Sequence, residues 1–350
     1  MSNSRRDFLG FGTAAAVVTL AAAEAAQAAP GAGMPIAPGA LAAHGALRLV
    51  TYAPPGGGAP RLGAVRPSGH VVDLGAAAKS KRVKLVFDPS SMLSLIAAGP
   101  PALAQARKLA AEGRDDGPLV SVVHLLAPIP VPARNVYAVG WNYLEHFEES
   151  LTAKNQKLPK HPVFFTKGTH TINGPYDPIP FDAKVSDKID WEGELAVIIG
   201  KHGRNIAEAD AMNYVFGFAV INDTTARDMQ EYHGGQWFKG KSLDGHGPIG
   251  PWIVPAADLD HTDLHLMTRV NGVVKQDIST SKMYFKVPRL IAELSLGLTL
   301  EPGDIIASGT PSGTGVARTP PEFLKPGDVL ETEIAEIGII RNVITQVSGA

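Results

Sequence analysis

The chain has 350 residues, of which 32 are Lys or Arg and 34 are Asp or Glu, so its formal charge is only −2 and gives no support for nucleic-acid binding. It contains no cysteine, which excludes disulfides, thiolate nucleophiles, zinc–thiolate sites and iron–sulfur clusters. Any bound metal must therefore have oxygen or imidazole ligands, and we expect the partner to be a small polar molecule.

The first residues are typical of an exported protein. Arg5 and Arg6 precede an apolar stretch that runs to about residue 23, and Ala26-Gln27-Ala28 offers a small-residue cleavage site. We interpret residues 1–29 as a twin-arginine-type signal peptide, which predicts recognition by the twin-arginine export machinery and a periplasmic location. The apolar stretch is shorter than the ~20 residues that cross a bilayer, so no stable membrane anchor is expected. An alanine-rich leader without a targeting role is the alternative.

A small α+β domain is predicted next in the chain. Residues 30–45 are rich in Ala, Gly and Pro without periodicity and read as a linker. The domain then spans residues 46–130 and ends in a proline-rich crossing. Its expected strands are 47–52, 62–65 and 71–74, and its expected helices are 92–97 and 101–112.

Strand-like runs dominate residues 131–350, the second predicted domain. Asn271-Gly272 between two such runs predicts a type I′ hairpin, because both central positions need positive φ. Strands and helices do not alternate regularly, which favours a β-rich α+β fold over a doubly wound sheet. The expected strands are 136–139, 163–165, 195–199, 215–221, 250–254 and 264–270, and the expected helices are 206–212, 224–232 and 287–296.

Three carboxylates stand at the ends of very apolar strands. Glu192 and Glu194 lie two residues apart, so they project to the same face of a strand. Asp223 ends the next apolar run, and like charges brought together need a compensating charge. Such a set suits Mg²⁺ or Mn²⁺, with Ca²⁺ as a further candidate. Spacing alone leaves a second reading open, in which the glutamates face solvent and Asp223 caps a helix.

Several sequence blocks in series resemble the fumarylacetoacetate hydrolase (FAH) family. The resemblance implies an FAH-type mixed β-sandwich or roll as the catalytic domain, and a homodimer. It also places Glu192, Glu194 and Asp223 on the three metal-ligand positions of the family. The blocks are residues 190–200, 221–228, 241–244, 250–252 and 309–315.

An upstream block, residues 140–149, resembles the family segment that bears a catalytic His and Glu. Here these are His146 and Glu149, whose i, i+3 spacing puts both on one face of a short helix. The carboxylate can then orient the imidazole, and the pair could activate a water as general base. The alternative is an exposed histidine beside an acidic cluster.

The remaining site residues also follow from the resemblance. Lys241 matches the catalytic lysine of the family, which supplies positive charge where negative charge develops. Taken singly, a lysine is more often a solvated surface charge, and a glycine-rich loop such as 309–315 can be a plain turn. That loop lacks the Gly-Lys-Ser/Thr ending of a phosphate-binding loop. The substrate-binding positions are matched by Lys167, Arg227, Gln230 and Thr310.

The sequence therefore predicts a metal-dependent hydrolase that cleaves a carbon–carbon bond in a 1,3-dicarbonyl or 2-oxo acid, such as an acylpyruvate or fumarylpyruvate. The lack of cysteine and of a G-x-S-x-G elbow favours water as the nucleophile. A decarboxylase or an isomerase or tautomerase of 2-oxo acids would use the same site. An exported protein that only binds organic acids is the alternative of another class.

Overall fold

The computed structural model describes residues 45–149 and 157–347. The predicted signal peptide, residues 1–29, lies outside this part, as does the predicted linker apart from its last residue. All described residues belong to one unit that spans 34–350. Within them, no helix is long and apolar enough to cross a membrane.

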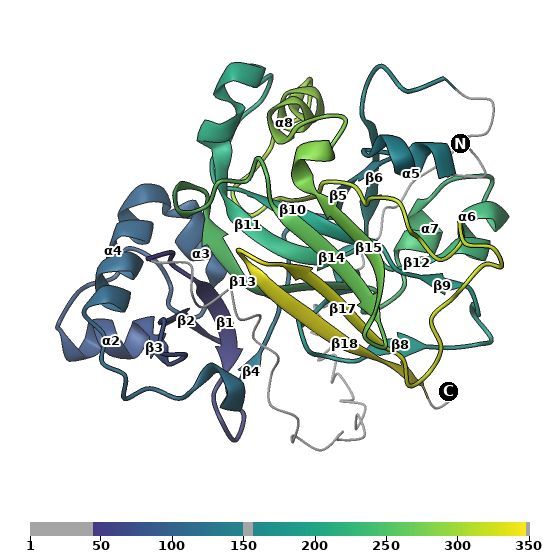
Figure 1. Cartoon of the computed structure of the whole chain (residues 1–350). Helices are drawn as coiled ribbons and strands as arrows, with labels where there is room; N and C mark the ends of the chain where they lie inside the picture. Colours follow the sequence, from purple (N-terminus) through teal and green to yellow (C-terminus); the bar gives the residue numbers. More distant parts are fainter. Residues whose placement is uncertain (1–44, 150–156, 348–350) are drawn as a thin grey trace, which may run out of the picture. The chain divides into compact units, whose positions relative to one another are not determined.

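An eleven-stranded sheet forms the centre of the fold (Figure 1). Its strands follow the order β3-β2-β1-β13-β11-β10-β16-β5-β6, with β4 beside β1 and β7 beside β13. The bounds are β1 Leu49–Ala53, β2 Arg61–Val65, β3 Val71–Asp73, β4 His124–Leu125, β5 Val136–Gly140, β6 Val163–Lys167, β7 Ile172–Asn173, β10 Gly193–Ile199, β11 Val215–Asn222, β13 Gly247–Pro255 and β16 Ile305–Ala307.

A five-stranded sheet, ordered β15-β14-β17-β18-β8, and a two-stranded pair, β12-β9, complete the β structure. The predicted hairpin is confirmed, because Val270 pairs with Val273 and both Asn271 and Gly272 have positive φ. The bounds are β8 Ile179–Phe181, β9 Ile189–Asp190, β12 Thr225–Ala226, β14 His265–Val270, β15 Val273–Ser279, β17 Val329–Ile334 and β18 Gly338–Gln346.

The helices are short and lie around the sheets. The prediction of a helix over 92–97 is confirmed by α3, and that over 287–296 by α8 within one residue. The segment predicted as helix 206–212 is instead a 3-10 helix, Glu208–Tyr214. The α-helices are α2 Leu74–Ser80, α3 Met92–Ala97, α4 Gly99–Ala111, α5 Leu144–Glu149, α6 Arg227–Tyr232, α7 Phe238–Lys241 and α8 Val287–Ser295.

The central strand β10 is buried on both faces, which explains its unbroken apolar run. Leu195 and Val197 belong to one core cluster, whereas Ala196 and Ile198 belong to another. The second cluster also contains Leu49 of β1, and β1 pairs with β13. The strands of residues 46–130 thus extend the central sheet, and the domain boundary near residue 130 stays a prediction. The mixed, β-rich α+β class predicted from the sequence is confirmed.

Strand directions gather several chain segments at one edge of this sheet. β10 runs antiparallel to both β11 and β16, and β16 runs parallel to β5. The start of β10 therefore lies at the same edge as the ends of β11, β16 and β5. The segments that follow these ends carry the candidate site.

Candidate active site

The three predicted metal carboxylates meet at this edge. Glu192 and Glu194 stand at the start of β10, and Asp223 follows β11. Gly193 pairs with Asn222, and the Asp223 N–H donates to the Glu192 carbonyl oxygen at 2.8 Å. All three side chains are buried, and one oxygen from each lies within 4.8 Å of the others. The strand pairing thus builds a compact carboxylate triad.

Cationic side chains surround two of these carboxylates. Lys241, at the end of α7, bridges Glu192 and Asp223, with its Nζ 2.8 Å from Asp223 Oδ2. Lys167 Nζ lies 2.7 Å from Asp223 Oδ1. Arg227 places Nη2 2.7 Å from Glu192 Oε1. Glu194 instead accepts a hydrogen bond from the Gly309 N–H at 2.7 Å.

These surroundings shift the pKa values of Glu192 and Glu194 in opposite directions. Burial alone would raise the pKa of Glu192, but the positive charges of Lys241 and Arg227 outweigh it and lower that pKa to about 2. For Glu194, burial and the neighbouring charges of Asp223 and Glu192 raise the pKa well above its usual value. Glu194 is thus the triad carboxylate without an ion pair among the described residues, and the Gly309 N–H and the charge of Lys241 only partly compensate its charge.

The donor set fits a hard divalent cation. With every group of the buried cluster ionised, four carboxylates face three cations, which leaves one surplus negative charge and agrees with the raised pKa of Glu194. A bound divalent ion would favour the ionised form of Glu194 and give the cluster a net charge of +1. Carboxylate oxygens have further lone pairs beyond those used by the lysines and Arg227, so they can also coordinate Mg²⁺ or Mn²⁺. The carboxylates are Asp190, Glu192, Glu194 and Asp223, and the cations are Lys167, Arg227 and Lys241.

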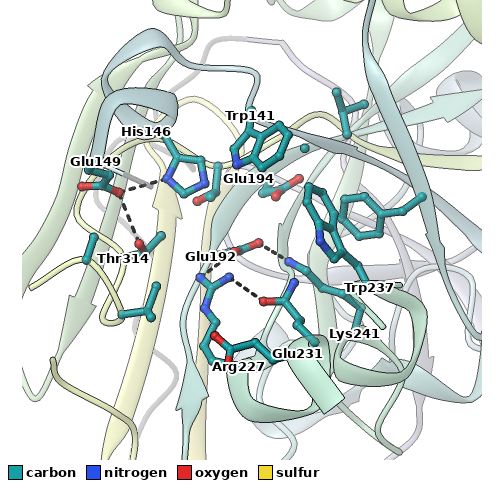
Figure 2. A pocket seen from close by; sticks show the side chains of 18 residues that line it. Trp141, His146, Glu149, Glu192, Glu194, Arg227, Glu231, Trp237, Lys241 and Thr314 are labelled. Atoms are coloured by element: carbon teal, nitrogen blue, oxygen red, sulfur yellow. Dashed lines mark hydrogen bonds and ion pairs between the residues drawn. The ribbon is translucent and has the colours of Figure 1, made fainter. Parts of the chain in front are cut away.

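The predicted His–Glu pair also comes together. His146 Nδ1 lies 2.9 Å from Glu149 Oε1 on α5. Glu149 accepts further hydrogen bonds from the Gly313 N–H at 2.9 Å and from Thr314 Oγ1 at 3.2 Å (Figure 2). Burial opposes ionisation of Glu149, but the hydrogen bonds from His146 and Gly313 outweigh it and lower its pKa. An ionised Glu149 holds the Nδ1–H form of His146 and leaves Nε2 able to accept a proton.

The glycine-rich loop between residues 309 and 315 holds the site carboxylates through its backbone. The N–H groups of Gly309, Gly313 and Gly315 donate to Glu194, Glu149 and Asp190, respectively. Gly309 and Gly313 have φ values of 99° and 98°, which residues other than glycine rarely adopt. The glycines therefore orient three carboxylate side chains of the candidate site.

Thr310 and Lys167 have roles in the structure that differ from simple substrate contacts. Thr310 lines the pocket, but its hydroxyl donates to the Gly193 carbonyl oxygen at 3.0 Å and accepts from Gln276 Nε2 at 2.8 Å. Lys167 is fully buried behind Asp223 and is not among the lining residues. Arg227 and Gln230 do line the pocket, and Arg227 Nη1 donates to Gln230 Oε1 at 3.2 Å.

Two residues that support the site had not been assigned a role. Asp190 is fully buried and accepts from Arg227 Nε at 2.7 Å and from the Gly315 N–H. In the sequence, the position of Asp190 two residues before Glu192 could have indicated that it belongs to the site. Gln276 on β15 links the Gly193 N–H to Thr310, and nothing in its local sequence, a hairpin strand, indicates this contact.

A cavity of about 360 Å³ is lined by Glu192 and Glu194 of the triad and by His146, Glu149 and Lys241 (Figure 2). One side is polar, with Glu149 and Thr314, and the other carries the aromatic rings of Trp141 and Trp237 beside Lys241. The volume suits a small organic molecule. A buried metal-ligand set beside a histidine base can remove a proton next to a carbonyl, or activate water.

Comparisons with known proteins agree with this geometry. A family model described as "Fumarylacetoacetate (FAA) hydrolase C-terminal" matches residues 135–345. The chain is 41% identical over 291 residues to "Oxaloacetate tautomerase YisK" of Bacillus subtilis (strain 168), covering 81% of this chain and 95% of that protein. It is 40% identical over 304 residues to "Oxaloacetate tautomerase FAHD2A, mitochondrial" of Homo sapiens, covering 85% and 91%.

A solved structure is also similar along most of the chain. It is titled "Fumarylacetoacetate hydrolase (EaFAH) from psychrophilic Exiguobacterium antarcticum". The TM-score is 0.70 at 37% sequence identity, and the match covers 86% of this chain and 100% of the other. Both the catalytic part and the strands that precede it are therefore shared with known proteins.

Proposed function

Because the chain belongs to the fumarylacetoacetate hydrolase family, we propose that it is a metal-dependent tautomerase that interconverts the keto and enol forms of a 2-oxo acid. The observation that carries the proposal is the buried carboxylate triad, whose Glu192 and Glu194 line one pocket with the His146–Glu149 pair. Carbon–carbon hydrolysis was the first expectation from the sequence. It becomes the weaker reading, because relatives at about 40% identity are named as oxaloacetate tautomerases.

The reaction moves one proton off carbon and places one on oxygen. In the keto-to-enol direction the C3–H bond breaks, a C2–C3 double bond forms and the C2 oxygen gains a proton. His146 Nε2 accepts the C3 proton, since its Nδ1 is held by Glu149. Lys241 Nζ has three N–H groups and engages two carboxylates, which leaves one N–H whose proton it would give to the C2 oxygen. The proton taken by His146 would then pass through solvent to the Lys241 amine, so that both residues return to their starting states.

The other pocket residues orient the acid. Glu192, Glu194 and Asp223 would hold Mg²⁺ or Mn²⁺, which when bound polarises the carbonyl. Arg227 and Gln230 line the pocket side by side and would bind the substrate carboxylate. Lys167 acts through Asp223, whose position it fixes.

The test is product analysis on one panel of acids. Metal-depleted protein, with and without added Mg²⁺ or Mn²⁺, is incubated with oxaloacetate, an acylpyruvate and fumarylpyruvate, and the products are followed by NMR and mass spectrometry. We expect metal-dependent keto–enol interconversion without a change in mass. Formation of two acids without it would establish the hydrolase instead, and release of carbon dioxide alone would establish a decarboxylase.

A further inference from the structure

Three aromatic rings form a continuous wall in the pocket. Trp141 follows β5, Phe165 lies on β6 and Trp237 precedes α7. The ring centroids of Trp141 and Trp237 are 5.1 Å apart, and those of Phe165 and Trp237 are 5.2 Å apart, both in edge-to-face geometry. All three line the cavity and are partly exposed. We call these three residues the aromatic wall.

The surrounding backbone is shaped to hold this wall. A Cβ at Gly140 would come within 2.3 Å of the Trp237 ring, so only glycine leaves room for it. Trp141 has a φ of 54°, an unfavourable conformation for a bulky residue. Backbone strain of this kind persists where neighbouring structure imposes it and is common at binding sites. The wall is therefore a fixed part of the pocket surface.

The charges of the pocket suit one carboxylate. Its described lining residues include two permanent cations, and each is already paired with carboxylates: Arg227 with Asp190 and Glu192, and Lys241 with Glu192 and Asp223. A divalent cation on the triad would leave the buried cluster with one surplus positive charge. A second substrate carboxylate would lose hydration without gaining a free cation among these residues.

The cavity also exceeds the size of a small dicarboxylic acid. At roughly 30 Å³ per non-hydrogen group, a four-carbon dicarboxylic acid such as oxaloacetate, with nine such groups, occupies about 270 Å³. The cavity measures about 360 Å³, and the aromatic wall forms part of its boundary. The remaining space, about 90 Å³, corresponds to the three additional non-hydrogen atoms of a phenyl group that replaces a carboxylate.

We propose that the aromatic wall selects 2-oxo acids whose C3 carries an aromatic or similarly apolar group in place of a second carboxylate. The inference rests on the proposed tautomerase function and adds the substrate class. This selectivity should appear both in kcat/KM and in the Kd of unreactive analogues. The apolar group packs against Trp141 and Trp237, while the 2-oxo acid end faces the triad and Lys241.

The test compares two pairs of compounds on Mg²⁺-loaded protein. Phenylpyruvate and oxaloacetate are assayed for keto–enol interconversion, and the unreactive analogues 3-phenyllactate and malate are titrated by tryptophan fluorescence, since two of the four tryptophans lie in the wall. We expect the phenyl compound to be favoured at least about tenfold in both kcat/KM and Kd. Equal or tighter binding of malate would overturn the inference.

A substitution in the aromatic wall tests whether the wall causes the preference for phenyllactate over malate. Trp141→Asn removes a ring while keeping a residue that tolerates positive φ. We expect it to lower the phenyllactate-to-malate affinity ratio about tenfold, whereas Tyr284→Asn, at an exposed aromatic outside the lining, leaves the ratio unchanged. An unchanged ratio in Trp141→Asn would contradict the role of the wall. Tight binding of phenyllactate without turnover of either 2-oxo acid would support the wall and overturn the tautomerase function.

Discussion

His146 and Glu149 form the proposed proton-transfer pair. Nδ1 of the ring is occupied by Glu149, and Glu149 is itself held by the Gly313 N–H. Replacement of His146 by Ala is expected to lower kcat about 10²- to 10⁴-fold, because a positioned base contributes about that factor. Metal content, measured by atomic emission, should stay the same. Unchanged turnover in His146→Ala would remove the pair from the mechanism.

Lys241 is a cation of the candidate site and would compete with a metal for the carboxylate triad. Its ammonium group contacts two of the three metal-site carboxylates, so its charge repels an incoming cation. Lys241→Met should therefore bind Mg²⁺ or Mn²⁺ about tenfold tighter by calorimetry, while turnover falls because the donor to the C2 oxygen is lost.

Lys239→Met is the matched control for this variant. Lys239 lies on the same helix, α7, but is exposed. Its removal should change neither the metal Kd nor the turnover. Weaker metal binding in Lys241→Met than in the unmodified protein would show that the lysine organises the triad instead of opposing the metal.

At the level of elements, the loop after β16 determines how the site is assembled. Gly313 has a φ of 98°, and a Cβ there would lie 2.1 Å from the Lys275 carbonyl oxygen. Gly313→Ala should lower the free energy of unfolding by about 1–3 kcal/mol and reduce turnover, because the N–H that holds Glu149 is displaced.

Gly327→Ala separates backbone strain from displacement of the loop. Gly327 has a similar φ of 94°, and a Cβ there would meet no atom within 4 Å. This variant should lose about 1 kcal/mol in a denaturant titration and keep its turnover. Equal turnover in both variants would show that the loop does not position Glu149.

Elements with strong local signals could be predicted from the sequence. The Asn271-Gly272 hairpin was predicted because its turn chemistry is local, and α8 because it begins with Val287-Pro288 and has a clear apolar face. Helix α2 was missed, since its Leu-Gly-Ala-Ala-Ala start follows a strand directly and its Asp73 cap was included in that strand. Strands β17 and β18 were not assigned, because their register depends on pairing with each other and with distant strands.

The same distinction between local and distant information holds for the site. Glu192, Glu194 and Asp223 could be found because each stands at the end of an apolar strand. The contacts of Gln276 and the wall formed by Trp141 and Trp237 join segments far apart in the chain, so local sequence could not reveal them. The metal assignment needed the family resemblance, because spacing left a solvated face equally open.

At the scale of the whole molecule, one buried histidine makes stability depend on pH. His246 is buried, its Nε2 lies 2.8 Å from the Pro180 carbonyl oxygen, and burial lowers its pKa from 6.5 to about 4. Above pH 6.5 neither the folded nor the unfolded state protonates this ring. As the pH falls from 6.5 to 4, His246 is protonated in the unfolded chain but stays neutral in the folded chain. The free energy of unfolding therefore falls by about 3 kcal/mol.

His246→Gln should therefore flatten the loss of unfolding free energy between pH 7 and pH 4 in denaturant titrations. His124→Gln is the contrasting control. A hydrogen bond to Asp177 raises the pKa of His124, so this residue stabilises the folded state most at low pH and its removal cannot flatten the loss. If His246→Gln left the pH dependence of the unfolding free energy unchanged, His246 would not be its cause.

Export and assembly are further whole-molecule proposals. The twin-arginine signal concerns residues outside the described part, and the homodimer rests on family resemblance. A reporter fused after Ala29 should reach the periplasm, and changing Arg5 and Arg6 to Lys should keep it in the cytoplasm. A reporter that stays cytoplasmic with the unmodified signal would rule out export.

We propose that the carboxylate triad holds a metal that assists proton loss from C3 of a 2-oxo acid. Hydrogen–deuterium exchange at C3, followed by NMR in D₂O on metal-depleted and Mg²⁺-loaded protein, measures this step whatever the final product. We expect fast exchange with Mg²⁺, and exchange at the uncatalysed rate after chelation or in Glu194→Gln, which removes one carboxylate of the triad. Exchange that is equally fast without metal, or in Glu194→Gln, would contradict this proposal.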